Sequence, residues 1–167
     1  MKEPWHMWFK PKTYAAFLSI FLLINCVSAT GKSQQIQQEG IAMNFEVLLK
    51  GSHSNFDEIT NRKISSQQDL NEIFAIINST RKPGYAVPEV DFTSFDLYFS
   101  ATGSLSTGGH SLDVHAVNRF PDAIEVRFIK SSPGPGEFAA TVISSPFVLV
   151  KLAKTDLPLV PVFLSKN

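Results

Sequence analysis

Two stretches in the second half of the chain decide its fold class: residues 111–117 read Ser-Leu-Asp-Val-His-Ala-Val, and residues 123–130 read Ala-Ile-Glu-Val-Arg-Phe-Ile-Lys. In both, apolar residues alternate with polar ones, which is the period of a β-strand with one buried face. Pro121-Asp122, between them, is a dipeptide typical of turns. We therefore expect an antiparallel hairpin. The buried face of its first strand would carry Leu112, Val114 and Ala116.

Further strands are predicted on both sides of a single helix. Residues 45–49, 59–64 and 95–100 have strand composition, and the nearly continuous apolar run 147–152 is typical of a strand buried on both faces. Between residues 64 and 80, apolar side chains recur at helical spacing, with Ser65 or Ser66 available as the N-cap and an end near Asn78. These apolar positions are Leu70, Ile73, Phe74 and Ile77. The sequence predicts an α+β fold with one helix packed on a twisted, mainly antiparallel sheet or small barrel.

Composition excludes several classes of protein. The chain has 167 residues, which is enough for one ordinary domain, and its 15 basic side chains are matched by 15 acidic ones, with no basic stripe for nucleic-acid binding. Its single cysteine can form neither an internal disulfide nor a cysteine-based zinc cage.

The first residues are interpreted as an export signal. Lysines precede the uncharged run 15–24, which would span about 15 Å as a helix and is too short for a bilayer core of roughly 30 Å. Val27-Ser28-Ala29 supplies small residues before a cleavage point, so we expect a signal peptide at 1–29, a polar Gln-rich tether at 30–40 and one domain at 41–165. The expected location is the periplasm, cell envelope or extracellular space of a bacterium.

A second interpretation of the leader concerns Cys26. Leu23-Ile24-Asn25-Cys26 is similar to a bacterial lipobox, in which Cys26 would become the lipidated first residue. Simple secretion is preferred because Asn25 occupies a position where a smaller residue is usual. Membrane contact is therefore expected only through the leader or a lipidated Cys26.

The C-terminal stretch 157–164 is apolar but contains Pro158 and Pro161. Because proline cannot donate a ladder hydrogen bond, this segment is predicted as an edge strand or an extended segment. We expect it to close the sheet of its own domain, since an exposed apolar edge promotes aggregation. The alternative is that it awaits a partner.

Candidate chemical groups in the hairpin predict no active centre. His110, Asp113 and His115 are near one another, but strand alternation places the two histidines on opposite faces, which leaves too few ligands for a metal. Ser111 shares a face with Asp113 and His115, yet residues two apart on a strand lie about 6.5 Å apart, beyond hydrogen-bond reach. We expect no catalytic residue, metal or cofactor. A hydrolase would require a distant base beside Ser106 or Ser111.

Two loop motifs flank the predicted hairpin. Thr107-Gly108-Gly109-His110 leads into the first strand, and Pro133-Gly134-Pro135-Gly136 follows the second. Both control the backbone, because glycine permits positive φ and close approach while proline stiffens the connection. They are the candidate interaction residues of the chain.

The ordered motifs resemble the PrcB C-terminal domain family. In that family a Thr-Gly-Gly-Tyr strand opening, a Pro-Gly-Pro-Gly loop and a Thr-x-Pro-Tyr strand follow one another, and here His110 and Phe147 replace the two tyrosines. The resemblance covers about residues 88–154. It implies an exported, non-catalytic module; the family's namesake is an accessory subunit that stabilises a surface protease complex, and the resemblance does not fix the partner of this chain.

Taken together, we expect a module that binds a protein partner and no nucleic acid, through the two glycine-containing loops or the C-terminal stretch. The alternative is a small-molecule or glycan binding module that uses a barrel mouth near Gly108-Gly109.

Overall fold

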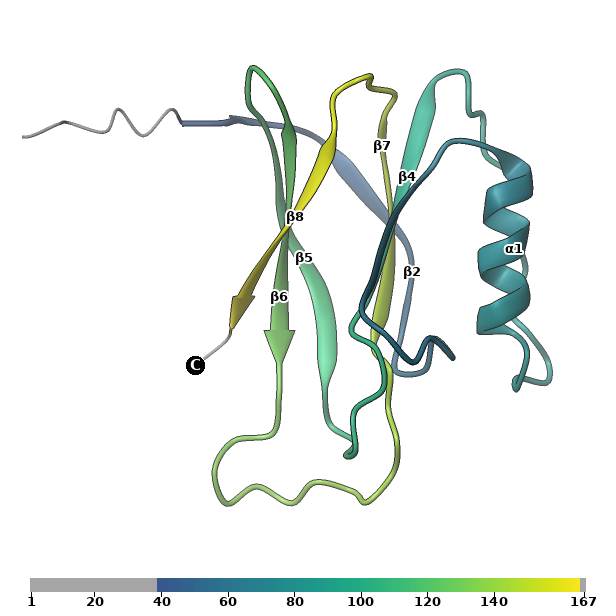
Figure 1. Ribbon diagram of the computed structural model, residues 1–167, viewed down its shortest axis with the longest axis vertical. Coiled ribbons are helices and arrows are strands. Elements are labelled where there is room, and N and C mark those ends of the chain that lie inside the picture. Colours follow the sequence, from purple (N-terminus) through teal and green to yellow (C-terminus); the bar gives the residue numbers. More distant parts are fainter. Residues whose placement is uncertain (1–38, 166–167) are drawn as a thin grey trace, which may run out of the picture. The chain divides into compact units, whose positions relative to one another are not determined.

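A computed structural model describes residues 39–165 of the chain. In these residues, eight strands form two four-stranded sheets, and one helix lies beside one of them (Figure 1). In chain order the elements are β1 (Ile41–Ala42), β2 (Phe45–Gly51), β3 (Thr60–Ile64), α1 (Gln67–Ile77), β4 (Phe95–Ala101), β5 (Ser111–Arg119), β6 (Ile124–Ser131), β7 (Phe147–Ala153) and β8 (Leu159–Ser165).

The strands divide between sheet A, in the order β1-β5-β6-β8, and sheet B, in the order β2-β7-β4-β3. All neighbours are antiparallel except β6 and β8, which run parallel. The predicted fold class, one helix on mainly antiparallel sheet structure, is confirmed. Within residues 39–165 the strands form two separate sheets that pack as layers and not a closed barrel, and the chain crosses from sheet A to sheet B between Ala42 and Phe45.

The helix has the boundaries that its sequence predicts. Ser66 is the N-cap, and its Oγ accepts a hydrogen bond from the Asp69 backbone N–H at 3.1 Å; Asn78 is the C-cap. Its buried face carries the four apolar residues at helical spacing, Leu70, Ile73, Phe74 and Ile77. This face packs on the outer side of sheet B, so α1 and the two sheets form three layers.

Sheet B lies between two hydrophobic cores. In β7, Phe147 and Leu149 face the helix, whereas Val148, Val150 and Leu152 face sheet A. This alternation explains why the sequence of β7 is an almost continuous apolar run, as predicted for a strand buried on both faces. Tyr98 of β4 also lies in the core between the sheets, where burial raises the pKa of its phenol to about 12.

The predicted alternation along β5 is wrong in its second half. The register with β6 shifts between Val114 and Ala116, so His115 is an extra residue without its own partner. Beyond this bulge Val117 is buried in the core, and Ala116 is not. The bulge also interrupts the single face that was expected for Asp113 and His115.

The C-terminal stretch packs on its own domain, as expected, and forms the edge strand β8. The ring of Phe163 stacks on that of Phe128, with centroids 5.4 Å apart, and the Lys130 ammonium lies 4.0 Å from the Phe163 centroid. The stretch therefore completes sheet A.

Candidate interaction surface

The two glycine-containing loops meet at one end of the sheets, below the strands in Figure 1. We call residues 104–110 together with residues 132–146 the loop end. Leu105 and Ser144 exchange backbone hydrogen bonds of 2.7 and 3.0 Å, and the Gly108 N–H donates to Ala140 O at 2.9 Å. The Ser144 hydroxyl donates to the Thr107 carbonyl at 2.6 Å. Segments that lie more than 30 residues apart in the sequence thus form one supported surface.

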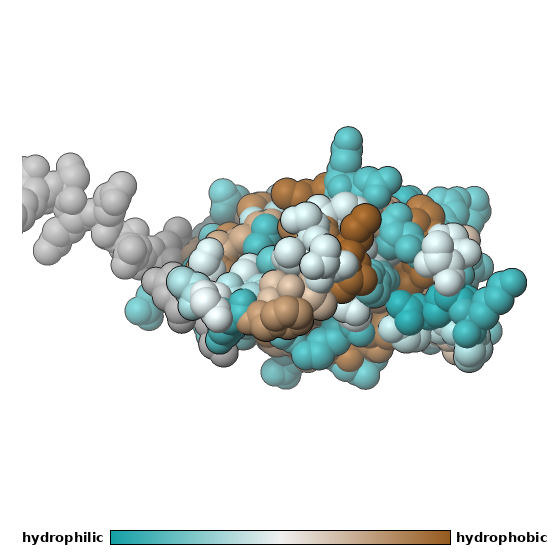
Figure 2. Space-filling view, turned by 90° about the horizontal axis from the view of Figure 1, so that it is seen from below, coloured by the Kyte–Doolittle hydropathy of each residue, from teal (hydrophilic) through white to brown (hydrophobic). Residues whose placement is uncertain are grey.

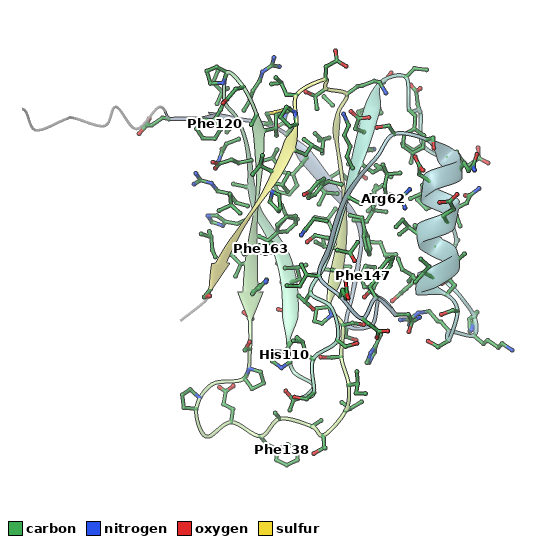
Figure 3. All side chains as sticks on the ribbon, viewed as in Figure 1. Arg62, His110, Phe120, Phe138, Phe147 and Phe163 are labelled. Carbon is green, nitrogen blue, oxygen red and sulfur yellow. The ribbon has the colours of Figure 1, made fainter. Side chains whose placement is uncertain are left out.

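The imidazole of His110 joins the two loops. Its Nε2 lies 2.8 Å from Thr107 Oγ1 in the first loop, and its Nδ1 lies 3.1 Å from Ser132 Oγ in the second. Neither Ser106 nor Ser111, the hydroxyls considered from the sequence, is the partner. Figure 3 shows His110 at the lower end of the sheets, above the loop that carries Phe138.

A hydroxyl beside an imidazole is also the first requirement of nucleophilic catalysis. In a hydrolase triad, however, a carboxylate orients the ring from its second nitrogen. Here hydroxyls occupy both ring nitrogens of His110, and among residues 39–165 neither nitrogen makes a hydrogen bond to a carboxylate. The geometry is that of a clasp between two loops.

Gly109 allows the loops to approach each other. Its φ of +85° lies in the region that favours glycine, and a Cβ built on it would lie 2.9 Å from Pro133 Cγ. Any larger residue would combine an unfavourable backbone conformation with a steric contact.

The Pro-Gly-Pro-Gly segment forms a closed turn. The Glu137 N–H donates to Gly134 O at 3.0 Å, and the Gly134 N–H donates to a Glu137 carboxylate oxygen at 2.8 Å. Glu137 is the only charged residue in the sequence between Lys130 and Lys151. Its carboxylate binds the turn, and residues 138–146, which follow it, have no charged side chain.

This uncharged surface exposes large apolar side chains that the sequence interpretation did not single out. Phe138 is 95% exposed, Ile143 66% and Val142 49%. Figure 2 looks onto this end and shows brown and tan apolar groups among pale small residues, with hydrophilic groups mainly towards the rim. The sequence signal was available, because residues 138–143 are mostly apolar and uncharged yet follow a turn motif.

The structure thus brings together the candidate residues of both motifs, Thr107 to His110 and Pro133 to Gly136, at one end of the molecule. Cys26, the candidate for lipidation, lies outside the described residues.

A cleft adjoins the loop end where a barrel mouth was considered. It has a volume of about 240 Å³ and lies between the end of β2 and the start of β5. Its lining residues are Lys50, Gly51, Ser52, His110, Ser111, Leu112 and Asp113. Lys50 Nζ and Asp113 Oδ1 form an ion pair of 2.5 Å, so the two charged groups that line it bind each other.

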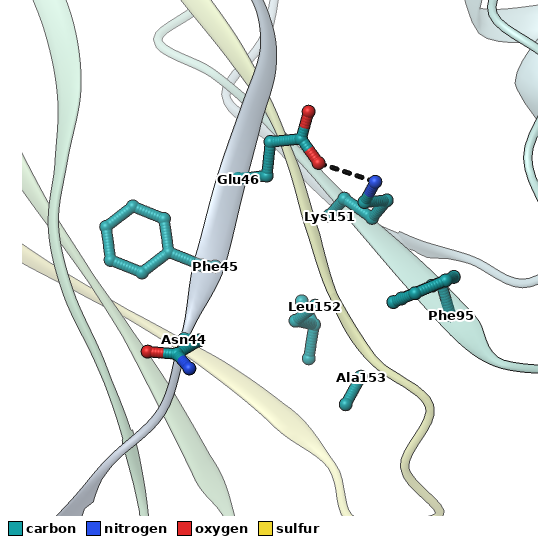
Figure 4. A pocket seen from close by; sticks show the side chains of 7 residues that line it. All are labelled: Asn44, Phe45, Glu46, Phe95, Lys151, Leu152 and Ala153. Carbon is teal, nitrogen blue, oxygen red and sulfur yellow. Dashed lines mark ion pairs between the residues drawn. The ribbon is translucent and has the colours of Figure 1, made fainter.

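A second hollow, of about 350 Å³, lies on sheet B (Figure 4). Its charged groups, Glu46 and Lys151, also pair with each other, at 2.5 Å, and Lys151 Nζ lies 4.9 Å from the centre of the Phe95 ring. In both hollows the two charged groups pair with each other instead of converging on an empty centre, which is unlike a typical small-molecule site.

A buried carboxylate lies at the opposite end of β4 from the loop end. Asp96 has no exposed surface and lies 3.0 Å from Lys63 Nζ and 3.5 Å from Lys154 Nζ. Burial alone would raise the pKa of this carboxyl, but hydrogen bonds from the Thr155 N–H, Lys63 and Ser65 outweigh burial and hold its pKa below the usual value. These contacts make Asp96 a structural anion.

Among residues 39–165 no three histidine, cysteine or carboxylate side chains are grouped to hold a metal ion. No helix in the same residues is both long and apolar enough to cross a bilayer.

Comparison with known proteins identifies one related family. No curated protein and no solved structure matches the chain. A family model described as PrcB C-terminal matches residues 98–153. The matched segment runs from β4 to the end of β7 and contains both loops of the loop end. Residues 98–153 therefore carry the PrcB C-terminal family pattern, which confirms the resemblance seen in the sequence motifs.

Proposed function

We propose that this protein is an exported, non-catalytic accessory module that binds a partner protein through its loop end. As the partner class we propose a subunit of a bacterial envelope or surface protease complex, by analogy with the namesake of the family. The observation that carries the proposal is the exposure of Phe138, Val142 and Ile143 on loops that the rest of the domain holds in place.

The support beneath these side chains favours binding over a role in packing. Exposed aromatic residues on a preorganised loop can bury large apolar areas in a partner without a large ordering cost. Backbone bonds from Gly108 and Leu105 and the His110 clasp provide that preorganisation. A patch of this kind on a soluble domain is typical of an interaction site.

The charge of the loop favours a protein partner over an anionic membrane. Attraction to anionic lipid requires clustered lysine or arginine near the surface. No basic residue occurs between Lys130 and Lys151, and the single acidic residue there, Glu137, binds the turn.

The test begins with a photoreactive amino acid at position 138 of the full chain, expressed in the native host, to crosslink and identify the partner. The affinity of the purified pair is then measured for Phe138→Asp and Ile143→Asp. We expect each to weaken binding at least tenfold, because a charge would enter an apolar contact.

Ile41→Asp is the matched control, because Ile41 is 71% exposed and lies on β1, which pairs with the other end of β5. It should bind within twofold of the wild type. All three variants replace exposed residues and should keep the wild-type melting temperature. Equal loss of binding in the control, or unchanged binding in Phe138→Asp, would contradict the proposal.

A further inference from the structure

One edge of β5 is largely unpaired. On one edge β5 pairs with β6, from Ser111 with Ser131 to Arg119 with Ile124, interrupted by the bulge at His115. On its other edge, β1 pairs only with Asn118 and Arg119, and the Met43 N–H donates to Val117 O at 2.8 Å. The chain then leaves for sheet B, so no strand within residues 39–165 pairs with the edge of residues 111–116.

The cleft of about 240 Å³ lies beside the first half of this unpaired edge, at residues 111–113. Its opposite wall is the end of β2, and small residues, Gly51, Ser52 and Ser111, form part of its lining. His110 belongs both to the cleft and to the clasp of the loop end, so the two surfaces are continuous. A segment that leaves a partner bound at the loop end could therefore enter the cleft directly.

We propose that the partner inserts an extended segment into this cleft. The segment pairs with β5 as an additional strand, on the same edge as β1 and beyond the point where the chain turns away at Met43. This inference rests on the proposed function, because it concerns the same partner. It specifies the chemistry of the occupant: an extended polypeptide whose backbone supplies the ladder bonds and whose side chains towards the cleft are small and uncharged.

A strand is the occupant that fits, because the N–H and C=O groups of a strand edge are complementary to those of another strand. The other free edge of sheet A belongs to β8, which contains Pro161 and so lacks one donor. The β5 edge has no proline. Its protection is instead local: the bulge at His115 and the Lys50–Asp113 ion pair across the cleft.

The Lys50–Asp113 ion pair is compatible with entry of the segment. The side chains of Lys50 and Asp113 are 61% and 46% exposed, so water can replace each partner at little cost. The pair would close the edge in the free protein and rearrange when the segment enters.

The test is amide-resolved hydrogen exchange on the full chain, alone and bound to the partner that crosslinks at position 138. Ladder formation should slow exchange at alternate amides of residues 111–116 at least tenfold on binding. In addition, Ser111→Trp, which fills the cleft, should weaken binding at least tenfold. Ser165→Trp places the same side chain on β8 at the opposite edge of sheet A and should bind normally.

Unchanged exchange in residues 111–116, or undiminished binding of Ser111→Trp, would overturn the inserted strand. If the partner still protects residues 138–143 and loses affinity for Phe138→Asp, the proposed function stands without this inference. If no protein contacts position 138, both fail.

Discussion

Asp96 shows how one residue can be fully buried and charged at once. Its carboxylate has no exposed surface, yet a backbone N–H from Thr155, the Ser65 hydroxyl and two lysines surround it. These contacts hold together the start of β4, the end of β3 and the segment after β7. The sequence alone did not single out this residue, because the four groups come from two segments, residues 63–65 and 154–155, that are distant from Asp96 in the sequence.

Replacing Asp96 tests this role. Asp96→Asn should lower the free energy of unfolding at pH 7 by about 2 kcal/mol, because charged hydrogen bonds are lost. The pKa of the Asp96 carboxyl is lowered in the fold, so its stabilisation is present above the unfolded pKa of about 3.9 and is lost as pH falls through the folded pKa. Urea unfolding at pH 7, 5 and 3 should therefore show the two proteins converging in acid.

Asp122→Asn, in the exposed turn between β5 and β6, is the control for that experiment and should match the wild type at each pH. A deficit in Asp96→Asn that stays constant from pH 7 to pH 3 would show that the charge of Asp96 has no part in stability.

At the scale of elements, the helix and the hairpin follow from local pattern, whereas the bulge does not. The positions of Ser66, Leu70 and Asn78 determine where α1 begins, which face it buries and where it ends. The strands β5 and β6 were predicted from alternation. An extra residue at His115 changes which residues of β5 face the core, although the composition of the strand stays that of an alternating strand. Such a shift depends on the partner strand, and a single strand's sequence does not encode it.

The two loops of the loop end contact each other, and substitutions at two glycines test how much this contact contributes to stability and binding. Gly109 and Gly136 have φ values of +85° and +84°, but only at Gly109 would a Cβ meet another loop, at Pro133. Gly109→Ala should destabilise the protein by about 2 kcal/mol and weaken partner binding, while Gly136→Ala should cost about 1 kcal/mol, from backbone strain alone. Thermal unfolding and binding affinity are the measurements. Equal effects of both substitutions would mean that the Gly109–Pro133 contact is unimportant.

For the whole molecule, the class of fold could be predicted, but the division into two sheets could not. The pairing of β2 with β7 joins residues about a hundred positions apart, and the parallel β6–β8 pair follows an intervening strand of the other sheet. The periodicity of the sequence does not indicate which strands pair with each other. The meeting of the two loops follows from this topology, since β4 ends, β5 begins, β6 ends and β7 begins at the same end.

The sequence indicated only some of the residues of the candidate interaction surface. The two motifs were singled out because their glycines and prolines control the backbone of the loops, whereas nothing in the sequence singled out Phe138, which is 95% exposed. Only the packed structure shows that its ring has nothing to pack against.

The proposed export, which concerns the whole molecule, has a direct test. Mass spectrometry of the protein purified from its native host should find Thr30 as the first residue. A diacylated Cys26 would replace simple secretion with a lipid anchor, and an intact Met1 would contradict processing altogether.

The short strand β1 shows at which end of the domain the described part of the chain begins. It pairs with Asn118 and Arg119, at the far end of β5 from Ser111 and the loop end. Eight residue steps along a strand separate these ends by about 26 Å. If the protein is attached through residues that precede β1, the attachment enters the domain at the end of β5 that is opposite to the loop end and Phe138.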